Sequence, residues 1–165
     1  FRMQLVKANS KHIPIIISLA KKIWPVAYGE ILSKAQLDYM IQKFYNETAL
    51  LESLAKGHVF YLAQNEQEKF VGFVSYEINC EPNKTKIHKI YVLPETQGSG
   101  VGKQFFQLVM AKAEENQQTA IFLNVNKYNK AIHFYTNLGF KIIKEEVIDI
   151  GNTYIMDDFV MEVNL

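Results

Sequence analysis

Hydrophobic positions along this chain follow two spacings, one helical and one alternating. Helical spacing after Asn9 and Ser10, either of which can cap a helix, predicts a helix that ends at Lys22, and Trp24–Gly29 then interrupt the pattern. Segments rich in Val, Phe and Tyr that alternate apolar and polar residues predict strands. In chain order the predicted elements are strand 2–8, helix 10–22, helices 34–45 and 47–56, strands 58–64, 69–80 and 85–93, helix 100–116, strand 119–125, helix 128–138, and strands 141–150 and 153–163.

This order of elements predicts an α/β protein of the mixed α+β type, with helices flanking a central sheet of about seven strands. The polar turn at 65–68 joins two strands as a hairpin, and the second half of the chain runs strand, helix, strand, helix, strand, strand. No internal repeat and no linker rich in Pro, Gly or Ser divides the sequence. We therefore expect a single domain over residues 1–165.

Composition narrows the classes of function. The 18 basic and 17 acidic residues leave a net charge of +1, without the basic excess of a nucleic-acid-binding protein, so nucleic acid is not an expected partner. Cys80 is the single cysteine, which excludes an internal disulfide and favours a cytoplasmic location. The apolar run Ile13–Ala20 contains Pro14 and Ser18 and is too short to span a membrane, so no membrane partner is expected.

Segment 93–103, Leu-Pro-Glu-Thr-Gln-Gly-Ser-Gly-Val-Gly-Lys, lies between a predicted strand and an amphipathic helix. Its three glycines leave backbone N–H groups uncovered at a helix N-terminus, and Lys103 adds a donor, so the segment predicts a phosphate-binding loop. A Walker A loop would need Gly at Gln97 and Ser or Thr at Gln104, and a dinucleotide fingerprint would need Gly at Lys103. A glycine-rich helix start without a ligand stays as an alternative.

The loop does satisfy the pattern Gln-x-x-Gly-x-Gly, and segment 124–140 contains an Asn shortly before Ala, then Phe-Tyr and Gly-Phe. These two signatures resemble those of the GNAT N-acetyltransferase superfamily. The resemblance covers residues 86–163 closely and implies the GNAT fold, with a mixed but mostly antiparallel sheet, and acetyl-CoA as the co-substrate. It also implies the cofactor-binding residues, which are Ile90, Tyr91, Val92, Leu93, Gln97, Gly98, Ser99, Gly100, Val101, Gly102, Lys103, Asn124 and Asn129.

Within the superfamily the chain is most similar to bacterial PaiA-type diamine and polyamine acetyltransferases, through Trp24–Tyr28, residues 89–94 and the tail with Asp157 and Asp158. This resemblance implies an enzyme that transfers the acetyl group of acetyl-CoA to a primary amine, with a small di- or polyamine as the acceptor. A peptide or protein N-terminal acetyltransferase would share every cofactor residue, and a non-catalytic acyl-CoA-binding regulator is a further alternative. The sequence leaves open whether the chain forms a homodimer.

Acetyl transfer to an amine needs an unprotonated nitrogen and an acid that protonates the leaving thiolate, and it requires no metal. By the resemblance, Tyr135 is the candidate acid and His88 the candidate base; a packing role for each is the alternative. Some histone-type relatives carry a catalytic Glu where this chain has Lys86, so a carboxylate base at that position is not expected. The other three histidines are interpreted as structural. The candidate substrate-binding residues are Tyr28, Glu30 and Glu77.

Overall fold

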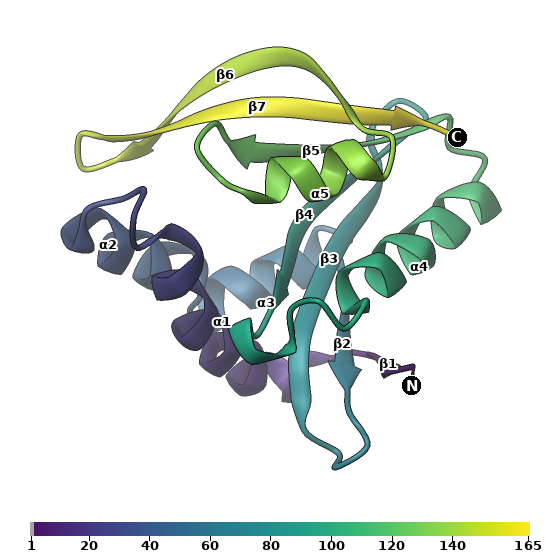
Figure 1. Ribbon diagram of the computed structural model, residues 1–165, viewed down its shortest axis with the longest axis horizontal. Helices are drawn as coiled ribbons and strands as arrows, with labels where there is room; N and C mark the ends of the chain where they lie inside the picture. The colour runs from purple at the N-terminus through teal and green to yellow at the C-terminus, as the bar shows by residue number, and fades with distance from the viewer. Residues whose placement is uncertain (1) are drawn as a thin grey trace.

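The computed structural model describes residues 2–165, which form a seven-stranded sheet with helices on both faces (Figure 1). The strands are β1 (Gln4–Lys7), β2 (Val59–Gln64), β3 (Phe70–Glu81), β4 (Lys84–Val92), β5 (Ala120–Asn126), β6 (Lys141–Gly151) and β7 (Tyr154–Asn164). The helices are α1 (Ile13–Tyr28), α2 (Lys34–Phe44), α3 (Glu47–Ala55), α4 (Val101–Glu115) and α5 (Ala131–Asn137), with short 3-10 turns η1 (Ser10–His12) and η2 (Pro94–Thr96).

The strands follow the order β1-β2-β3-β4-β5-β7-β6 across the sheet. Strands β4 and β5 are parallel, and the other neighbouring strands pair antiparallel. The parallel pair needs a crossover connection, which α4 supplies, whereas the hairpins β2–β3, β3–β4 and β6–β7 need only tight turns. The predicted mixed and mostly antiparallel sheet is therefore confirmed.

Helix α1 continues through the segment where the sequence pattern predicted an interruption. Pro25 lies inside the helix, at a cost of roughly 3 kcal/mol, because its ring lacks an N–H and crowds the preceding turn. Trp24 and Tyr28 are 5% and 6% exposed, and their rings lie 4.8 Å apart. Burying two large side chains, each worth roughly 1.5–3 kcal/mol, offsets that cost. The predicted end of this helix at Lys22 is therefore wrong.

Helix α5 begins later than the predicted start at residue 128. The Asn126 side-chain oxygen accepts a hydrogen bond from the Tyr128 amide (2.9 Å), and the Asn129 oxygen accepts one from the Ala131 amide (2.8 Å). Asn side chains that bond the backbone two residues ahead stabilise turns in competition with a helix. The predicted helical start at Tyr128 is replaced by an Asn-stabilised turn.

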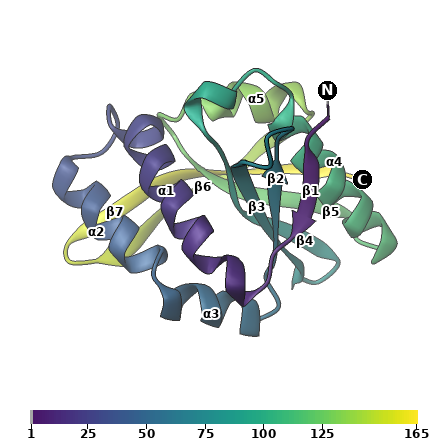
Figure 2. The same ribbon diagram turned by 90° about the horizontal axis from the view of Figure 1, so that it is seen from below.

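Helices α1, α2 and α3 gather on one face of the sheet, and α4 and α5 lie on the other (Figure 1, Figure 2). On the first face, the ring of Tyr91 in β4 lies 5.7 Å from that of Trp24 in α1. On the second face, a Cβ atom built on Gly72 of β3 would lie 3.4 Å from the Phe105 ring of α4. We call these two surfaces the α1 face and the α4 face. No helix in the part of the chain that the structure describes is long and apolar enough to cross a membrane.

Candidate active site

The loop between β4 and α4 is exposed and turns on glycines. Gly98 and Gly100 both have φ of +86°, the left-handed conformation that side-chain-bearing residues rarely adopt. Ser99 fixes the turn by donating a hydrogen bond from its hydroxyl to the Thr96 carbonyl at 2.6 Å. The glycine requirement at these two positions is therefore one of backbone conformation, because a Cβ atom at either would meet nothing within 4 Å.

The free backbone amides of this loop favour the binding of an anion. Within residues 2–165, the backbone N–H groups of Gly98 and of residues 100–103 have no hydrogen-bond partner, and the first α4 amide with one is that of Gln104. Free amides at the start of a 15-residue helix bind anions because the helix dipole adds partial positive charge there. Lys103 is exposed beside them. This arrangement suits a phosphate or diphosphate group.

Gly102 has a different reason to be glycine. A Cβ atom at this position would lie 3.0 Å from Cζ of Phe134 in α5, closer than nearly all real contacts. The absence of a side chain therefore allows the first turn of α4 to pack directly against α5. This contact brings the amides of the loop and the start of α5 together on the α4 face.

Strands β4 and β5 separate beside the loop. Their parallel pairing ends at Ile87 and Leu123, although β4 continues to Val92 and β5 to Asn126. Beyond this point β4 pairs only with β3, and β5 pairs only with β7. The inner edges of both strands therefore carry backbone groups without a strand partner, and we call this opening the split. Such an edge can bind the amide groups of a ligand.

Strand β4 also contains a β-bulge at His88. Ser75 of β3 pairs with Lys89, but the next residue, Tyr76, pairs with Ile87, so His88 is an extra residue in the ladder. In a regular strand, His88 and Lys89 would point to opposite faces. The bulge allows both side chains to lie on the α1 face.

His88 belongs to a polar cluster on that face. Its Nε2 atom lies 2.9 Å from Oε1 of Glu77, and its ring stacks on that of His58 with centroids 3.9 Å apart. The His58 Nε2 atom lies 3.4 Å from the same Glu77 oxygen. These three atoms lie within 4.8 Å of one another, a spacing that a transition metal could bridge. The hydrogen bond between His88 and Glu77 accounts for this spacing without a metal.

Burial changes the titration of the residues in the bulge. It lowers the pKa of His88 to about 4, and the hydrogen bond to Glu77 offsets only part of this effect. Burial and the nearby Lys86 charge lower the pKa of Lys89 to about 8, and the Lys89 Nζ atom lies 5.4 Å from the centre of the Tyr45 ring. His88 is therefore neutral at neutral pH.

Three tyrosines meet at the split. The hydroxyls of Tyr28 in α1 and Tyr91 in β4 lie 3.0 Å apart. Tyr135 of α5 approaches from the α4 face and is 7% exposed; burial, followed by the neighbouring Tyr28, raises its pKa well above the usual value. Tyr135 is therefore protonated at neutral pH and is a weaker acid than an ordinary tyrosine, so a role as proton donor depends on its position at the split.

The sequence matches a known family over most of these elements. The model of the acetyltransferase (GNAT) domain matches residues 30–156, which include β2 to β5, the loop and α5. The chain belongs to the GNAT acetyltransferase family. It is accordingly an N-acetyltransferase that uses acetyl-CoA, as predicted from the loop and from segment 124–140.

Individual GNAT proteins agree with this assignment. The chain is 30% identical over 132 residues to the 5-NmdU N-acetyltransferase of Pseudomonas phage PaMx11, covering 78% of this chain and 91% of the phage protein. It is 25% identical over 158 residues to an uncharacterized N-acetyltransferase in the pepI 3' region of Lactobacillus delbrueckii subsp. lactis, covering 91% of each. The PaiA N-acetyltransferase of Thermoplasma acidophilum, crystallised with coenzyme A, superposes over all of both chains with a TM-score of 0.83 at 22% identity, a likeness of fold.

The predicted cofactor residues of this GNAT chain do not all lie together. Residues 97–103 form the end of the loop and the first residues of α4. The candidates in β4 lie along the edge of that strand that faces the split. Asn124 instead directs its side chain to two carboxylates: its Nδ2 atom lies 3.0 Å from Glu146 and 3.3 Å from Asp158. The Asn129 side-chain oxygen caps the turn before α5.

The predicted substrate residues are also dispersed. Tyr28 lies at the split and Glu77 in the polar cluster, but Glu30 is exposed in the turn after α1. The sequence analysis assigned no site role to His58, Lys89 or Asp158: it interpreted His58 as structural and used Lys89 and Asp158 only for the resemblance. Only the bulge, the stacking of two histidines and the pairing of β5 with β7 bring these residues near the split.

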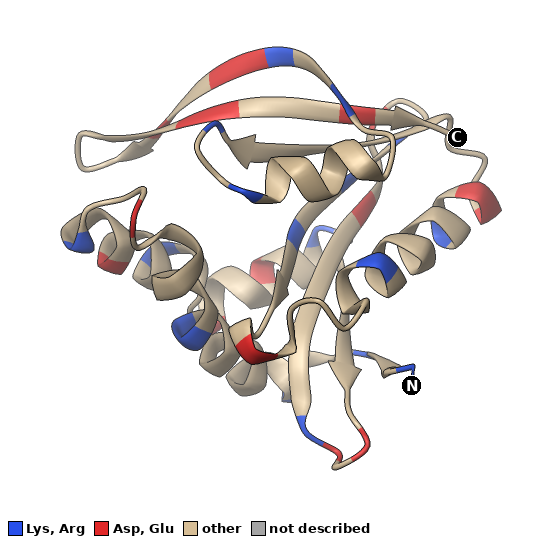
Figure 3. Ribbon diagram, in the orientation of Figure 1, with Lys and Arg blue, Asp and Glu red and all other residues tan. Residues whose placement is uncertain are grey.

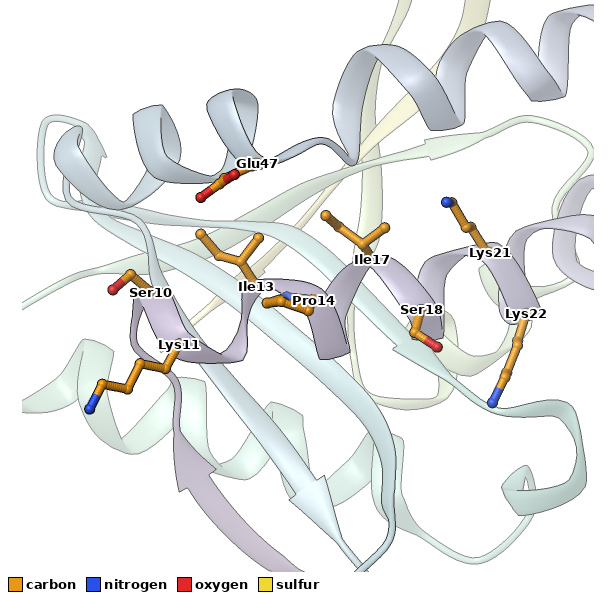
Figure 4. Close-up of a pocket in the computed structure, with 9 residues that line it drawn as sticks. All are labelled: Ser10, Lys11, Ile13, Pro14, Ile17, Ser18, Lys21, Lys22 and Glu47. Carbon is orange, nitrogen blue, oxygen red and sulfur yellow. The ribbon is translucent and has the colours of Figure 1, made fainter.

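The grooves on the surface of this GNAT domain include one along α1 and one over the sheet. The larger, of about 640 Å³, runs along α1 towards Glu47 of α3 and includes Ile13, Ile17 and several lysines (Figure 4). It contains no residue of the loop, the split or the polar cluster. The smaller, of about 330 Å³, lies over β4, β5 and β7 and includes Lys86 and Asn124. The smaller groove is therefore the one beside the split.

Proposed function

We propose that this enzyme acetylates a primary amine of a small di- or polyamine. The groups on the two sides of the split support this proposal. The side of the loop has uncharged backbone with many hydrogen-bond donors, and the α1 face has carboxylates. Those carboxylates include Glu77, Glu146 and Asp158, and acidic residues are frequent along β6 and β7 (Figure 3). Carboxylates attract a cationic amine.

The cofactor is expected to bind through the free amides of the loop and along the inner edge of β4. When bound, acetyl-CoA supplies the thioester that the amine attacks. Tyr135 is the proposed acid that protonates the leaving thiolate; its position next to the split supports this role, whereas burial raises its pKa and makes it a weaker acid. His88 is the proposed base; its low pKa favours a role in passing the proton to Glu77 or to water rather than in holding it.

The proposal also covers the domain organisation and the cellular location of the enzyme. We keep the single domain over residues 1–165 and the cytoplasmic location, the latter supported by the single cysteine. A homodimer stays open. The alternative acceptor, a peptide or protein N-terminus, would use the same loop and the same split.

A screen for thiol release tests the acceptor class. Purified enzyme and acetyl-CoA are incubated with diamines, spermidine, amino acids and peptides with a free N-terminus, and free coenzyme A is measured. We expect the diamines and spermidine to give the highest kcat/KM. We also expect their KM to rise with salt, because exposed charge pairs are screened over about 8–10 Å at physiological ionic strength. Turnover of neutral-side-chain peptides with inert polyamines would contradict the proposal.

A further inference from the structure

Asp158 carries a carboxylate oxygen that no group of the described chain satisfies. The residue lies in β7, opposite Asn126 of β5, at the level where β5 has separated from β4. It is 6% exposed, and its Oδ1 atom has neither a hydrogen-bond partner nor an ion-pair partner among residues 2–165. A buried charge without a partner is costly, so the site is suited to a ligand that supplies one.

The neighbours of Asp158 leave this oxygen free. Asn124 donates to the other oxygen, Oδ2, at 3.3 Å and to Oε1 of Glu146 at 3.0 Å. An amide nitrogen has two hydrogens, so these two carboxylates use the donor capacity of Asn124. Burial raises the pKa of Asp158, and the hydrogen bond from Asn124 and the Lys86 charge counter this effect only in part.

The adjacent acidic residue, Asp157, has a cation beside it. Asp157 points its side chain away from that of Asp158, as neighbours in a strand do. Its Oδ1 atom forms an ion pair with Lys127 Nζ at 2.9 Å, and its side chain is 38% exposed. The two consecutive carboxylates of β7 thus differ in exposure and in their partners: Asp157 has a cation beside it, whereas Asp158 has none at ion-pair distance among residues 2–165.

A groove open to solvent lies next to Asn124, the residue that donates a hydrogen bond to Asp158. The groove of about 330 Å³ beside the split is lined by Lys86, Phe122, Asn124 and Glu146, and Asn124 joins it to the Asp158 carboxylate. This volume is within the range of small-molecule sites. On the inner side, the Asp158 charge also acts on Tyr28, which bonds to Tyr91 at the split.

We propose that the Asp158 carboxylate binds the ammonium group of the acceptor, and that the groove lined by Asn124 and Glu146 holds the rest of that molecule. The inference rests on the proposed function and adds to it a residue that selects primary amines. An ammonium group has three donors, so it can satisfy Oδ1 and still reach a second acceptor. The bound ammonium would become a nucleophile near the split only after one of its protons passes to His88, the proposed base, or to water.

Direct binding tests the inference without turnover. The carboxyl carbons of aspartates are labelled with ¹³C, and the wild-type enzyme with bound coenzyme A is titrated with 1,4-diaminobutane, spermidine and simple alkylamines. Asp157→Asn and Asp158→Asn assign the two signals. We expect the Asp158 signal to move along a saturable curve and the Asp157 signal to stay unchanged. No movement of the Asp158 signal with any amine would overturn the inference.

Kinetics separates this inference from the proposed function. Asp158→Asn should raise the KM of the best amine by at least about tenfold, the scale of one lost charge-assisted hydrogen bond, and leave the KM of acetyl-CoA within about twofold. Asp157→Asn, the matched control, should leave both close to the wild type. An unchanged amine KM in Asp158→Asn would overturn the inference while wild-type turnover upholds the function. Absence of amine turnover in the wild type would instead contradict the function, and the titration would still decide on Asp158.

Discussion

The two sides of the split differ in the chemical groups that they offer to a ligand. On the α4 face, the loop offers backbone N–H groups, and its glycines serve conformation and close packing. On the α1 face, the site consists of charged and titratable side chains. Burial lowers the pKa values of His88 and Lys89. Burial acts to raise the pKa of Glu77, but hydrogen bonds with His88 and Cys80 outweigh it and lower that pKa. The cofactor side should therefore respond to changes of backbone shape, and the acceptor side to changes of charge.

Tyr135, which enters the split from the α4 face, should show the largest effect. Tyr135→Phe keeps the ring and its packing but removes the hydroxyl that we propose as the acid. We expect kcat to fall by about 10²- to 10⁴-fold, with a small change in the free energy of unfolding. Steady-state kinetics and thermal denaturation measure the two quantities.

The control for this change is Tyr128→Phe, because Tyr128 is 73% exposed and lies in the turn before α5. It should keep wild-type kcat. If Tyr135→Phe also turned over at the wild-type rate while chemistry limits turnover, Tyr135 would be a packing residue only.

A change of backbone shape on the cofactor side should have an intermediate effect. Gly100→Val forces a β-branched residue into a left-handed conformation and disturbs the free amides of the loop. We expect acetyl-CoA affinity to fall by about 1–2 kcal/mol, or roughly 5- to 30-fold, as measured by calorimetry. Gly57→Val is the matched control, because Gly57 has φ of +94° with nothing within 4 Å but lies outside the site. Equal affinities in both variants would contradict the anion-binding assignment.

The charge of the acceptor side should appear in the pH dependence of stability. His88 has a pKa of about 4 when folded and an ordinary value of 6.5, so between these pH values the unfolded chain binds more protons. The free energy of unfolding should thus be highest above pH 6.5 and fall by about 2–3 kcal/mol towards pH 4. Urea denaturation at several pH values measures it.

His88→Gln should flatten this dependence, leaving a part of the same sign from His58, whose pKa burial also lowers. It should also remove any limb of the kcat/KM profile that lies near pH 4. A profile that is the same in both enzymes would assign proton removal to another group.

The cofactor side was predictable because it is local in sequence. Strand, proline, glycines and helix follow one another within residues 85–116, and each residue type has a backbone reason that can be recognised without a structure. The wrong prediction on this side, the start of α5, also has a local cause. Asn126 and Asn129 bond the backbone ahead of them and delay α5, and the pattern of apolar residues gives no sign of such competition.

The acceptor side was predictable only in part, because its residues come from segments far apart in the chain. His88, Glu77 and Tyr28 were candidates, but their grouping with His58, Lys89 and Asp158 was not predicted. His58 precedes β2, Glu77 lies in β3, Lys89 in β4 and Asp158 in β7. Burial alters the pKa values of His58, Lys89 and Asp158, and the hydrogen bond with His88 helps to lower that of Glu77. Both effects depend on strand order and on the bulge, which the sequence does not reveal. Glu30, a plausible choice by its distance from Trp24, remains exposed in a turn.

The bulge in β4 adds His88 to a strand whose pairing with β3 does not need that residue. If residue 88 were missing, Ser75 and Tyr76 would face consecutive residues and Ile87 and Lys89 would keep their present faces, although the second irregularity of this pairing, between Glu77 and Glu81, would remain. A gene lacking this one codon would still encode a strand that pairs correctly. The register of strand pairing therefore does not require the histidine, whose side chain instead contacts His58 and Glu77.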